Sequence, residues 1–183
     1  MRESEQDAGW VVNAQCGDRN AMEHLLRRVQ MPLRRYIVRL VGPTAADDVL
    51  QEVLTSIARK LTWLAEPRLF RPWAYRIASR SAFAHLRKEK RRRQHETDGE
   101  VAEGVAVPVG PPSGDQLREL LDNAILSPAC RAVVMLHFQE DMPLADVAAV
   151  LELPLGTVKS RLAYGLAALR RHFADEKERT NGG

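Results

Sequence analysis

Cysteine is scarce in this chain of 183 residues, which contains only Cys16 and Cys130. The two lie far apart, without a CxxC pair or a Cys/His spacing typical of metal ligands, so the sequence predicts neither a disulfide framework nor a metal site. Free cysteines usually behave as small buried hydrophobic residues, and we expect both to serve in packing. The five histidines form no ligand or triad pattern, and the glycines form no phosphate-binding loop. We therefore expect no enzyme, no cofactor and no small-molecule substrate.

Long hydrophobic runs are also absent. No stretch approaches the roughly 20 apolar residues that cross a membrane, and the acidic start MRESEQDAGW lacks the features of a secretory signal. We therefore expect a cytoplasmic protein that is not embedded in a membrane. Aromatic residues make up only 5% of the chain, so aliphatic residues supply most of its apolar content. No strand alternation or hairpin signal is present, and the predicted fold class is all-α.

Residues 94–113, QHETDGEVAEGVAVPVGPPS, are rich in glycine and proline and have no helical periodicity. A segment of this length and composition predicts a flexible linker between two small helical domains, residues 1–93 and 114–183. In the first domain we expect helices near 7–16, 18–41, 45–63 and 71–92, with breaks at Gly42–Pro43–Thr44 and Glu66–Pro67.

Positive charge is concentrated in the first domain. Residues 1–93 hold 19 Lys and Arg against 10 Asp and Glu, whereas residues 94–126 hold 1 against 7 and residues 127–183 hold 7 of each. A block of like charge that continues a patterned helix indicates a polyanionic partner, and nucleic acid is the expected one. This block contains Arg87, Lys88, Lys90, Arg91, Arg92 and Arg93, interrupted by Glu89.

Residues 144–169, LADVAAVLELPLGTVKSRLAYGLAAL, pair two amphipathic helical patterns across a short break. Each pattern has an apolar stripe that needs to be buried. Pro154 fits the first turn of the second helix, where its missing N–H costs little. The first stripe contains Leu144, Val147, Ala148 and Leu151, and the second contains Leu155, Val158, Leu162, Leu166 and Leu169.

The opposite face of the second helix combines hydroxyl groups, a guanidinium fork and an ammonium group. Such groups can contact base edges and phosphates in a major groove, so the segment predicts a helix-turn-helix. A plain helical hairpin with a solvated charged face is the alternative. The candidate DNA-contacting residues are Thr157, Lys159, Ser160, Arg161 and Tyr164.

The predicted 45–63 helix has two faces. Val49, Val53, Ile57 and Leu61 form an apolar stripe, and Asp48, Gln51, Glu52 and Thr55 form a polar stripe at the same spacing. A helix dipole accounts for Asp47 and Asp48 near the start of the helix. A docking surface for a basic protein partner accounts for Asp47, Asp48, Gln51 and Glu52 together, and both interpretations stay open on this pattern.

The predicted 71–92 helix alternates cations with aromatic residues, a composition that suits binding of single-stranded nucleic acid by stacking and phosphate contact. The preceding loop, TWLAEPRLFRP, is long enough to form a pocket. Phe70, Trp73, Ile77 and Ala84 are expected to face the core. The candidate DNA-contacting residues are Trp63, Tyr75, Arg76, Arg80, Phe83, Arg87 and Lys88, of which Trp63, Tyr75 and Phe83 are the candidates for exposed stacking.

Several segments in order along the chain resemble motifs of the extracytoplasmic function sigma factors. CGDRNAMEHLLRR and ADDVLQEVL are similar to the family's first conserved segments, and FRPWAYRIASRSAFAHLRKEKRR is similar to its arginine-rich helix. LSPACRAVVMLHFQEDMPLADVAAVLELPLGTVKSRL is similar to its C-terminal helix-turn-helix region. The resemblance covers nearly the whole chain.

The resemblance implies a role for each patterned face. Asp48, Gln51 and Glu52 would dock on core RNA polymerase, and the arginine-rich helix with its preceding loop would open promoter DNA at the minus-ten element. The helix-turn-helix would read the minus-thirty-five element, and the acidic linker would follow the RNA exit path. An anti-sigma factor is an implied partner. The rival interpretation is a two-domain transcriptional regulator that binds duplex operator DNA without polymerase.

Four positions depart from the family pattern. Arg80 replaces the usual Asn, Ala84 the usual Asp, Glu152 the usual turn Gly and Pro154 the usual capping Ser. A glycine adopts positive φ at low cost, so we expect Glu152 to be strained unless the turn has changed shape.

Overall fold

The structure is a computed structural model that describes residues 2–96 and 126–181. The chain divides into two compact units, Met1–Asp98 (unit 1) and Gly99–Gly183 (unit 2). Every regular element in the described ranges is a helix, which confirms the all-α fold. The predicted linker, residues 94–113, lies outside the described residues except at its start. There α4 continues through Glu96, so the first three residues assigned to the linker are helical.

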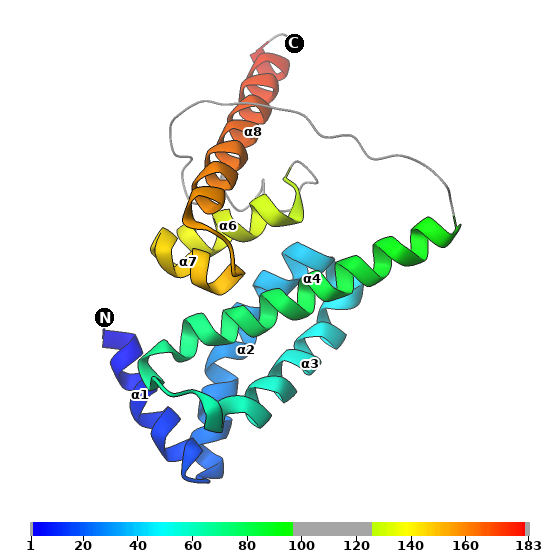
Figure 1. The fold of residues 1–183 in the computed structure, drawn as a ribbon. Coiled ribbons are helices and arrows are strands. Elements are labelled where there is room, and N and C mark those ends of the chain that lie inside the picture. The colour runs from blue at the N-terminus through cyan, green and yellow to red at the C-terminus, as the bar shows by residue number, and fades with distance from the viewer. Residues whose placement is uncertain (1, 97–125, 182–183) are drawn as a thin grey trace. The chain divides into compact units, whose positions relative to one another are not determined.

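Unit 1 is a bundle of helices (Figure 1). α2 contacts α1, α3 and α4, and α3 also contacts α4. These helices span Arg2–Gln15 (α1), Arg19–Val41 (α2), Pro43–Lys60 (α3) and Phe70–Glu96 (α4), with the short 3₁₀ helices Leu61–Trp63 (η1) and Pro67–Leu69 (η2) between α3 and α4. The fully buried side chains at the centre include Leu25, Leu33, Tyr36, Ile37, Val53, Ile57, Phe70, Ala74, Ala78 and Ala82.

Local capping explains where these helices begin and end. The side chain of Asp18 accepts the backbone N–H groups of Asn20 (2.8 Å) and Ala21 (3.2 Å), as expected for a residue that starts a helix. Gly42 separates α2 from α3 with φ of 84°, a value that glycine adopts readily. Pro43 then occupies the first turn of α3, where its fixed φ is favourable.

The start of α3 decides one of the two interpretations of its acidic residues. Because α3 begins at Pro43, its first turn contains no acidic residue, and Asp47 and Asp48 lie in the second turn. The helix dipole acts mainly within the first turn. The dipole therefore does not account for these two residues.

Unit 2 contains α6 (Pro128–Phe138), α7 (Leu144–Leu151) and α8 (Leu155–Asn181), and α8 packs against both of the others. Cys130 on α6 is buried, as expected of a packing residue, but Cys16 in unit 1 is exposed, so that prediction was wrong for Cys16. The buried side chains of this unit include Leu126, Ala132, Val133, Val134, Met135, Leu136, Val147, Val150, Val158, Ala167 and Leu169.

The turn between α7 and α8 keeps the shape of a helix-turn-helix despite its unusual residues. Glu152 adopts the left-handed conformation, with φ of 56° and ψ of 45°. The N–H of Leu153 donates to the carbonyl of Ala148 (3.0 Å), a bond typical of a helix C-terminus that ends in this conformation. Pro154 lies just before α8, and its carbonyl accepts the N–H of Val158 (3.1 Å). Pro154 thus takes the capping position instead of the first turn.

Candidate nucleic-acid and protein interfaces

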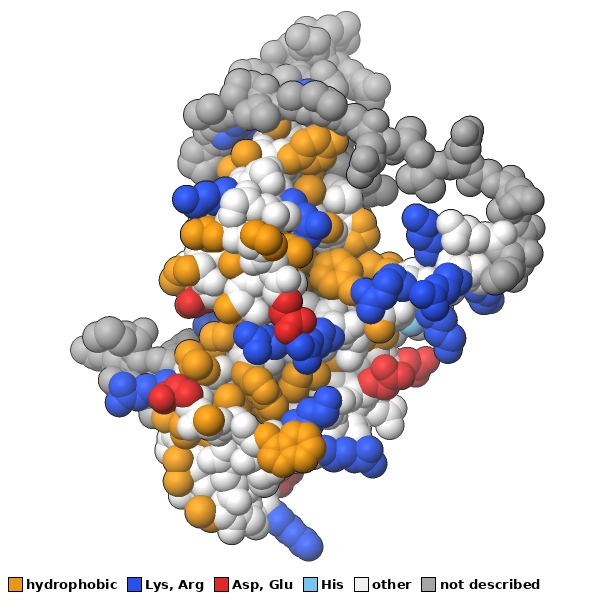
Figure 2. Space-filling view, viewed as in Figure 1, with side chains coloured by type: hydrophobic (Ala, Val, Ile, Leu, Met, Phe, Trp, Pro, Cys, Tyr) orange, Lys and Arg blue, Asp and Glu red, His pale blue; other side chains and the backbone are white. Residues whose placement is uncertain are grey.

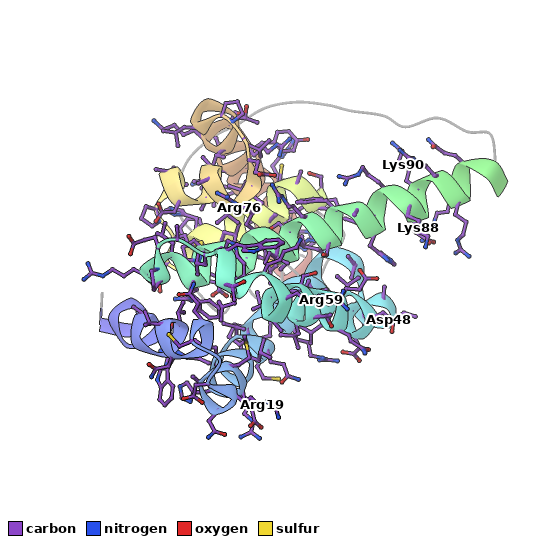
Figure 3. The ribbon with its side chains drawn as sticks, turned by 60° about the horizontal axis from the view of Figure 1, so that its bottom comes forward. Arg19, Asp48, Arg59, Arg76, Lys88 and Lys90 are labelled. Carbon is purple, nitrogen blue, oxygen red and sulfur yellow. The ribbon has the colours of Figure 1, made fainter. Side chains whose placement is uncertain are left out.

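The polar face of α3 is exposed along its length, opposite the buried residues Val49, Val53 and Ile57. Figure 3 shows Asp48 and Arg59 on this helix. Ser56 and Arg59 were missed by the sequence analysis, although they continue the same helical spacing. The face forms a shallow groove, here called the α3 groove, lined by Asp48, Gln51, Glu52, Thr55, Ser56 and Arg59.

Asp47 differs from the other predicted docking residues because it does not line the α3 groove. Its carboxylate pairs with Arg34 of α2, whose Nε lies 2.8 Å from Oδ1 and whose second nitrogen lies 3.4 Å from Oδ2. These hydrogen bonds and the charge of Arg34 hold the pKa of Asp47 below its ordinary value. The pair links α2 to α3, and it gives Asp47 a structural role beside the groove.

The segment from the end of α3 to the first residue of α4, residues 61–70, combines buried and exposed side chains. Leu61 and Phe70 are fully buried and Leu64 is nearly so, whereas Trp63 is 78% exposed and Leu69 is 53% exposed. We call this segment the DNA loop, after the role expected for it. The exposure predicted for Trp63 is confirmed, and the loop places a large aromatic ring in contact with solvent.

The predicted core stripe of α4 was partly wrong. Phe70 is buried, but Trp73 is only half-buried and Ala84 is exposed. Ile77 is buried as predicted, and the buried surface also includes Tyr75 and three alanines, Ala74, Ala78 and Ala82, whose small side chains allow neighbouring helices to pack closely. Helical spacing does not show which alanines a neighbouring helix covers, since Ala84 was expected to be buried and is exposed.

Tyr75 is a correction of the same kind. It was predicted to stack on DNA, yet only 1% of it is exposed. Its ring packs edge-on against Tyr36, with ring centroids 5.3 Å apart. The carbonyl of Tyr75 accepts the hydroxyl of Ser79 (2.8 Å), and that hydroxyl lies 2.8 Å from the hydroxyl of Tyr36. Tyr75 is therefore part of the core and not of a DNA-binding surface.

The remaining predicted residues of α4 lie at its surface. Arg76 and Phe83 are half-buried, and Arg80, Arg87 and Lys88 are exposed. The C-terminal half of α4 extends beyond α2 and α3 (Figure 1), and Lys88 and Lys90 project from it (Figure 3). Lys and Arg side chains gather along this half of the helix (Figure 2). The arrangement presents cations on a projecting rod, which suits contact with phosphates.

One carboxylate lies among these cations. Glu89 accepts hydrogen bonds from Arg92 (2.9 Å) and Arg93 (3.2 Å), one helical turn further along. These bonds hold the pKa of Glu89 below its ordinary value. Glu89 therefore offsets part of the positive charge at the end of the rod.

In unit 2 the predicted DNA-facing residues lie at the surface of α8. Lys159 and Ser160 are exposed, Thr157, Arg161 and Tyr164 are half-buried, and Val158 between them is fully buried. The hydroxyl of Ser160 donates to the carbonyl of Thr157 (3.0 Å). The predicted polar face and its buried counterpart are therefore confirmed in this part of the helix.

Leu155 was placed in the inward stripe of α8, but it is 41% exposed. Leu155 is the first residue of the helix, and periodicity does not indicate where the covering helices end. An apolar side chain thus lies next to the hydroxyls and cations at the start of α8, where the N-terminal residues of a helix-turn-helix contact base edges.

Within the described ranges, no helix is both long and apolar enough to cross a membrane. The His, Cys, Asp and Glu side chains of those ranges form no group of three that could hold a metal ion.

Solved structures are similar to most of the chain, among them those of CnrH and RpoE. CnrH, in complex with the cytosolic domain of CnrY, superposes with a TM-score of 0.64 at 22% identity, over 92% of this chain and 97% of that one. The sigma factor RpoE of Bartonella quintana, in complex with the anti-sigma factor NepR, superposes with a TM-score of 0.63 at 23% identity, over 81% of this chain and 94% of that one. Both establish the fold.

Sequence comparisons establish the family. The Sigma-70 region 2 model matches residues 23–92, and the Sigma-70 region 4 model matches residues 124–171. RNA polymerase sigma-H factor of Pseudomonas aeruginosa is 30% identical over 175 residues, which are 88% of this chain and 91% of that protein. The ECF RNA polymerase sigma factor SigW of Bacillus subtilis is 28% identical over 180 residues, 90% and 95% of the two chains. This chain therefore belongs to the RNA polymerase sigma factors, in their extracytoplasmic function group.

Proposed function

We propose that this sigma factor divides its work between its two units. Unit 1 binds core RNA polymerase through the α3 groove and opens the minus-ten element through the DNA loop and α4. Unit 2 reads the minus-thirty-five element through the start of α8. We propose that the two domains are residues 1–93 and 114–183 and that residues 94–113 form the linker between them. One observation supports this division above the others. Each unit matches one sigma region, and each has an exposed face of polar and charged side chains suited to the contacts proposed for that region.

Docking on polymerase rests on the charge and shape of the α3 groove. Asp48 and Glu52 offer exposed carboxylates one turn apart, and Gln51 offers an amide beside them. Carboxylates on a firm helical face complement a basic protein surface. Asp47 supports the face from outside the groove by tying α3 to α2 through Arg34.

Contact with the minus-ten element rests on the DNA loop and the exposed cations of α4. Trp63 offers a ring on which an unpaired base can stack, and Arg80, Arg87 and Lys88 can neutralise phosphates of the same strand. Arg76 and Phe83, half-buried on the same helix, complete the surface. In unit 2, Thr157, Lys159, Ser160, Arg161 and Tyr164 are proposed to contact the upstream element.

An anti-sigma factor is the proposed inhibitory partner, because the structural neighbour RpoE is found in complex with one. Such a partner would cover the polymerase and DNA faces described above. We further propose that the protein acts in the cytoplasm, without catalytic activity of its own, because it belongs to the sigma factors.

Competition for core polymerase tests the docking assignment. Glu52→Arg reverses a charge inside the α3 groove, and we expect it to compete poorly with wild type for core enzyme. Glu23→Arg is the matched control, because it makes the same charge change at an exposed site on α2. Circular dichroism should show native helix content for both variants. Equal competition by Glu52→Arg and wild type would show that the docking face is elsewhere.

A further inference from the structure

Gln15, the last residue of α1, is hydrogen-bonded to the backbone of the DNA loop, which lies far from it in the sequence. Its side-chain nitrogen donates hydrogen bonds to the carbonyl of Leu61 (2.9 Å) and to the carbonyl of Leu64 (2.8 Å), 46 and 49 residues further along the chain. A glutamine amide has two N–H donors, and both are used here. One side chain thus fixes both ends of η1.

The bonds matter because η1 is only Leu61–Trp63 and ends with the backbone bond from the N–H of Leu64 to the carbonyl of Leu61 (3.0 Å). Carbonyl groups outside regular helices need a donor when they are withdrawn from water. Gln15 is partly buried and supplies a donor to the carbonyl of Leu64 and a second donor to that of Leu61, while α1 also contacts η1 and η2. The backbone of the loop is therefore tied to α1.

Trp63 lies between the two carbonyls that Gln15 holds. The side chains of Leu61 and Leu64 on either side of it are buried, but Trp63 is 78% exposed. The tie therefore acts on the backbone directly beneath the most exposed aromatic ring described for the loop. A ring carried on an ordered backbone loses less conformational freedom when it binds than a ring on a mobile one.

We propose that Gln15 is a positioning residue for promoter DNA, which orders the DNA loop so that Trp63 is in place before the strand arrives. This inference rests on the proposed function, in which Trp63 contacts the minus-ten strand. Gln15 acts through the loop backbone and does not itself touch the DNA.

The test measures binding of a fluorescent single-stranded minus-ten oligonucleotide by reconstituted holoenzyme. Gln15→Met keeps the length of the side chain and removes both donors. Gln30→Met is the matched control at an exposed position of α2. We expect Gln15→Met to weaken binding about three- to tenfold, the effect of one additional side chain to be ordered. Its affinity for core enzyme and its circular dichroism should match those of Gln30→Met.

A double-mutant cycle with Trp63→Ala separates positioning from general loss of structure. If Gln15 acts through Trp63, Gln15→Met should cost nothing further once the ring is gone. Additive losses of affinity in the double variant would overturn the positioning role. The role would also be overturned if Gln15→Met bound the oligonucleotide normally while Trp63→Ala bound it poorly. In that second case the proposed function stands and only the inference fails. Normal binding by Trp63→Ala would overturn both, because the loop would then have no DNA contact to position.

Discussion

Gly165 of α8 lies so close to α6 that a β-carbon added to it would stand 3.1 Å from Cγ2 of Val134. Val134 is fully buried and β-branched, so its side chain has essentially one rotamer in a helix and cannot turn away. Gly165→Ala would gain about 1 kcal/mol of helix propensity, but overpacking a core costs about 1–3 kcal/mol. We expect a net loss of stability, seen as faster hydrogen exchange of the α8 amides in the full chain.

Gly156→Ala is a control on the same helix, because nothing lies within 4 Å of a β-carbon added there. Gly156→Ala should keep or raise protection of α8 from exchange, by up to about 1 kcal/mol. Equal protection in the two variants would show that the approach of α8 to α6 tolerates a methyl group.

Ser79 and Tyr36 form a buried polar contact between α4 and α2, with their hydroxyl oxygens 2.8 Å apart. Ser79→Ala leaves the Tyr36 hydroxyl without this partner, and a buried hydroxyl that loses its bond costs about 1–3 kcal/mol. We expect this loss in urea unfolding monitored by tryptophan fluorescence, since Trp10, Trp63 and Trp73 all belong to unit 1. In a Tyr36→Phe background the same substitution should cost less. A cost that is unchanged there would mean that the hydroxyl contact contributes no coupling.

Glu152 occupies a left-handed backbone conformation that costs a residue with a β-carbon about 1–2 kcal/mol. Glu152→Gly should relieve most of this strain, although the more flexible unfolded chain offsets part of the gain. We expect a net stabilisation of about 1 kcal/mol in the exchange of α7 and α8 amides. Glu152→Ala removes the carboxylate but keeps the β-carbon, and it should give no such gain. If both variants stabilise equally, the effect comes from the side chain and not from the backbone.

Glu89 reduces the charge that α4 presents to DNA, because Arg92 and Arg93 both donate to it. Glu89→Gln should strengthen holoenzyme binding to non-promoter duplex and steepen its salt dependence, by up to about two units if both arginines gain a phosphate. Glu23→Gln makes the same change in net charge on α2, beside Arg27, and should have a smaller effect. Equal salt slopes for the two variants would indicate that net charge, not position, is responsible.

The pH dependence of this effect follows from the direction of the shift. The arginine bonds lower the pKa of Glu89, so its contribution to helix stability is present at neutral pH and is lost as pH falls through the lowered pKa. The affinity of wild type for non-promoter duplex should therefore differ from that of Glu89→Gln at neutral pH. The two affinities should become equal only below the pH range in which an ordinary glutamate is protonated. If the two affinities become equal within that ordinary range, Glu89 is not paired with Arg92 and Arg93 in solution.

Arg161 and Lys159 should contribute differently to recognition of the upstream element. Arg161 offers a bidentate fork suited to guanine, and exposed Lys159 offers a single charge suited to phosphate. Arg161→Ala should cost about 1–3 kcal/mol on the preferred element and reduce discrimination among base substitutions, whereas Lys159→Ala should weaken binding to all duplexes and lower the salt slope by about one unit. Fluorescence anisotropy of holoenzyme on a set of substituted elements measures both. Unchanged discrimination by Arg161→Ala would exclude it from base recognition.

The sequence predicted helices well where large aliphatic residues mark the buried face. Val49, Val53 and Ile57 of α3 and Leu61, the first residue of η1, are all buried as expected, because their size and spacing make this the apolar face. On α4 the buried surface combines Phe70, Tyr75 and Ile77 with the alanines Ala74, Ala78 and Ala82, and the predicted stripe was wrong at Trp73 and Ala84. Burial of small residues depends on how closely a neighbouring helix approaches, which periodicity does not encode.

Contacts between residues far apart in the sequence were the part of the candidate site that the sequence did not predict. The pairing of Arg34 with Asp47 links two helices, and the bonds from Gln15 span 46 and 49 residues of the sequence. Neither has a local signal, because one arginine or one glutamine on a polar face resembles any other. The exposed Trp63 could be predicted from composition and loop position, but the way its backbone is held could not.

The bonds from Gln15 also make the state of the DNA loop depend on the docking of α1. A single helix can detach locally with a free energy well below that of global unfolding. When α1 detaches, the carbonyls of Leu61 and Leu64 lose the hydrogen bonds from Gln15, while the contacts of α3 with α2 remain. The fraction of molecules with an ordered DNA loop should then follow the fraction with α1 docked. On warming, we expect promoter affinity to decline before polymerase affinity does, so that holoenzyme forms at temperatures where it no longer opens its promoters efficiently.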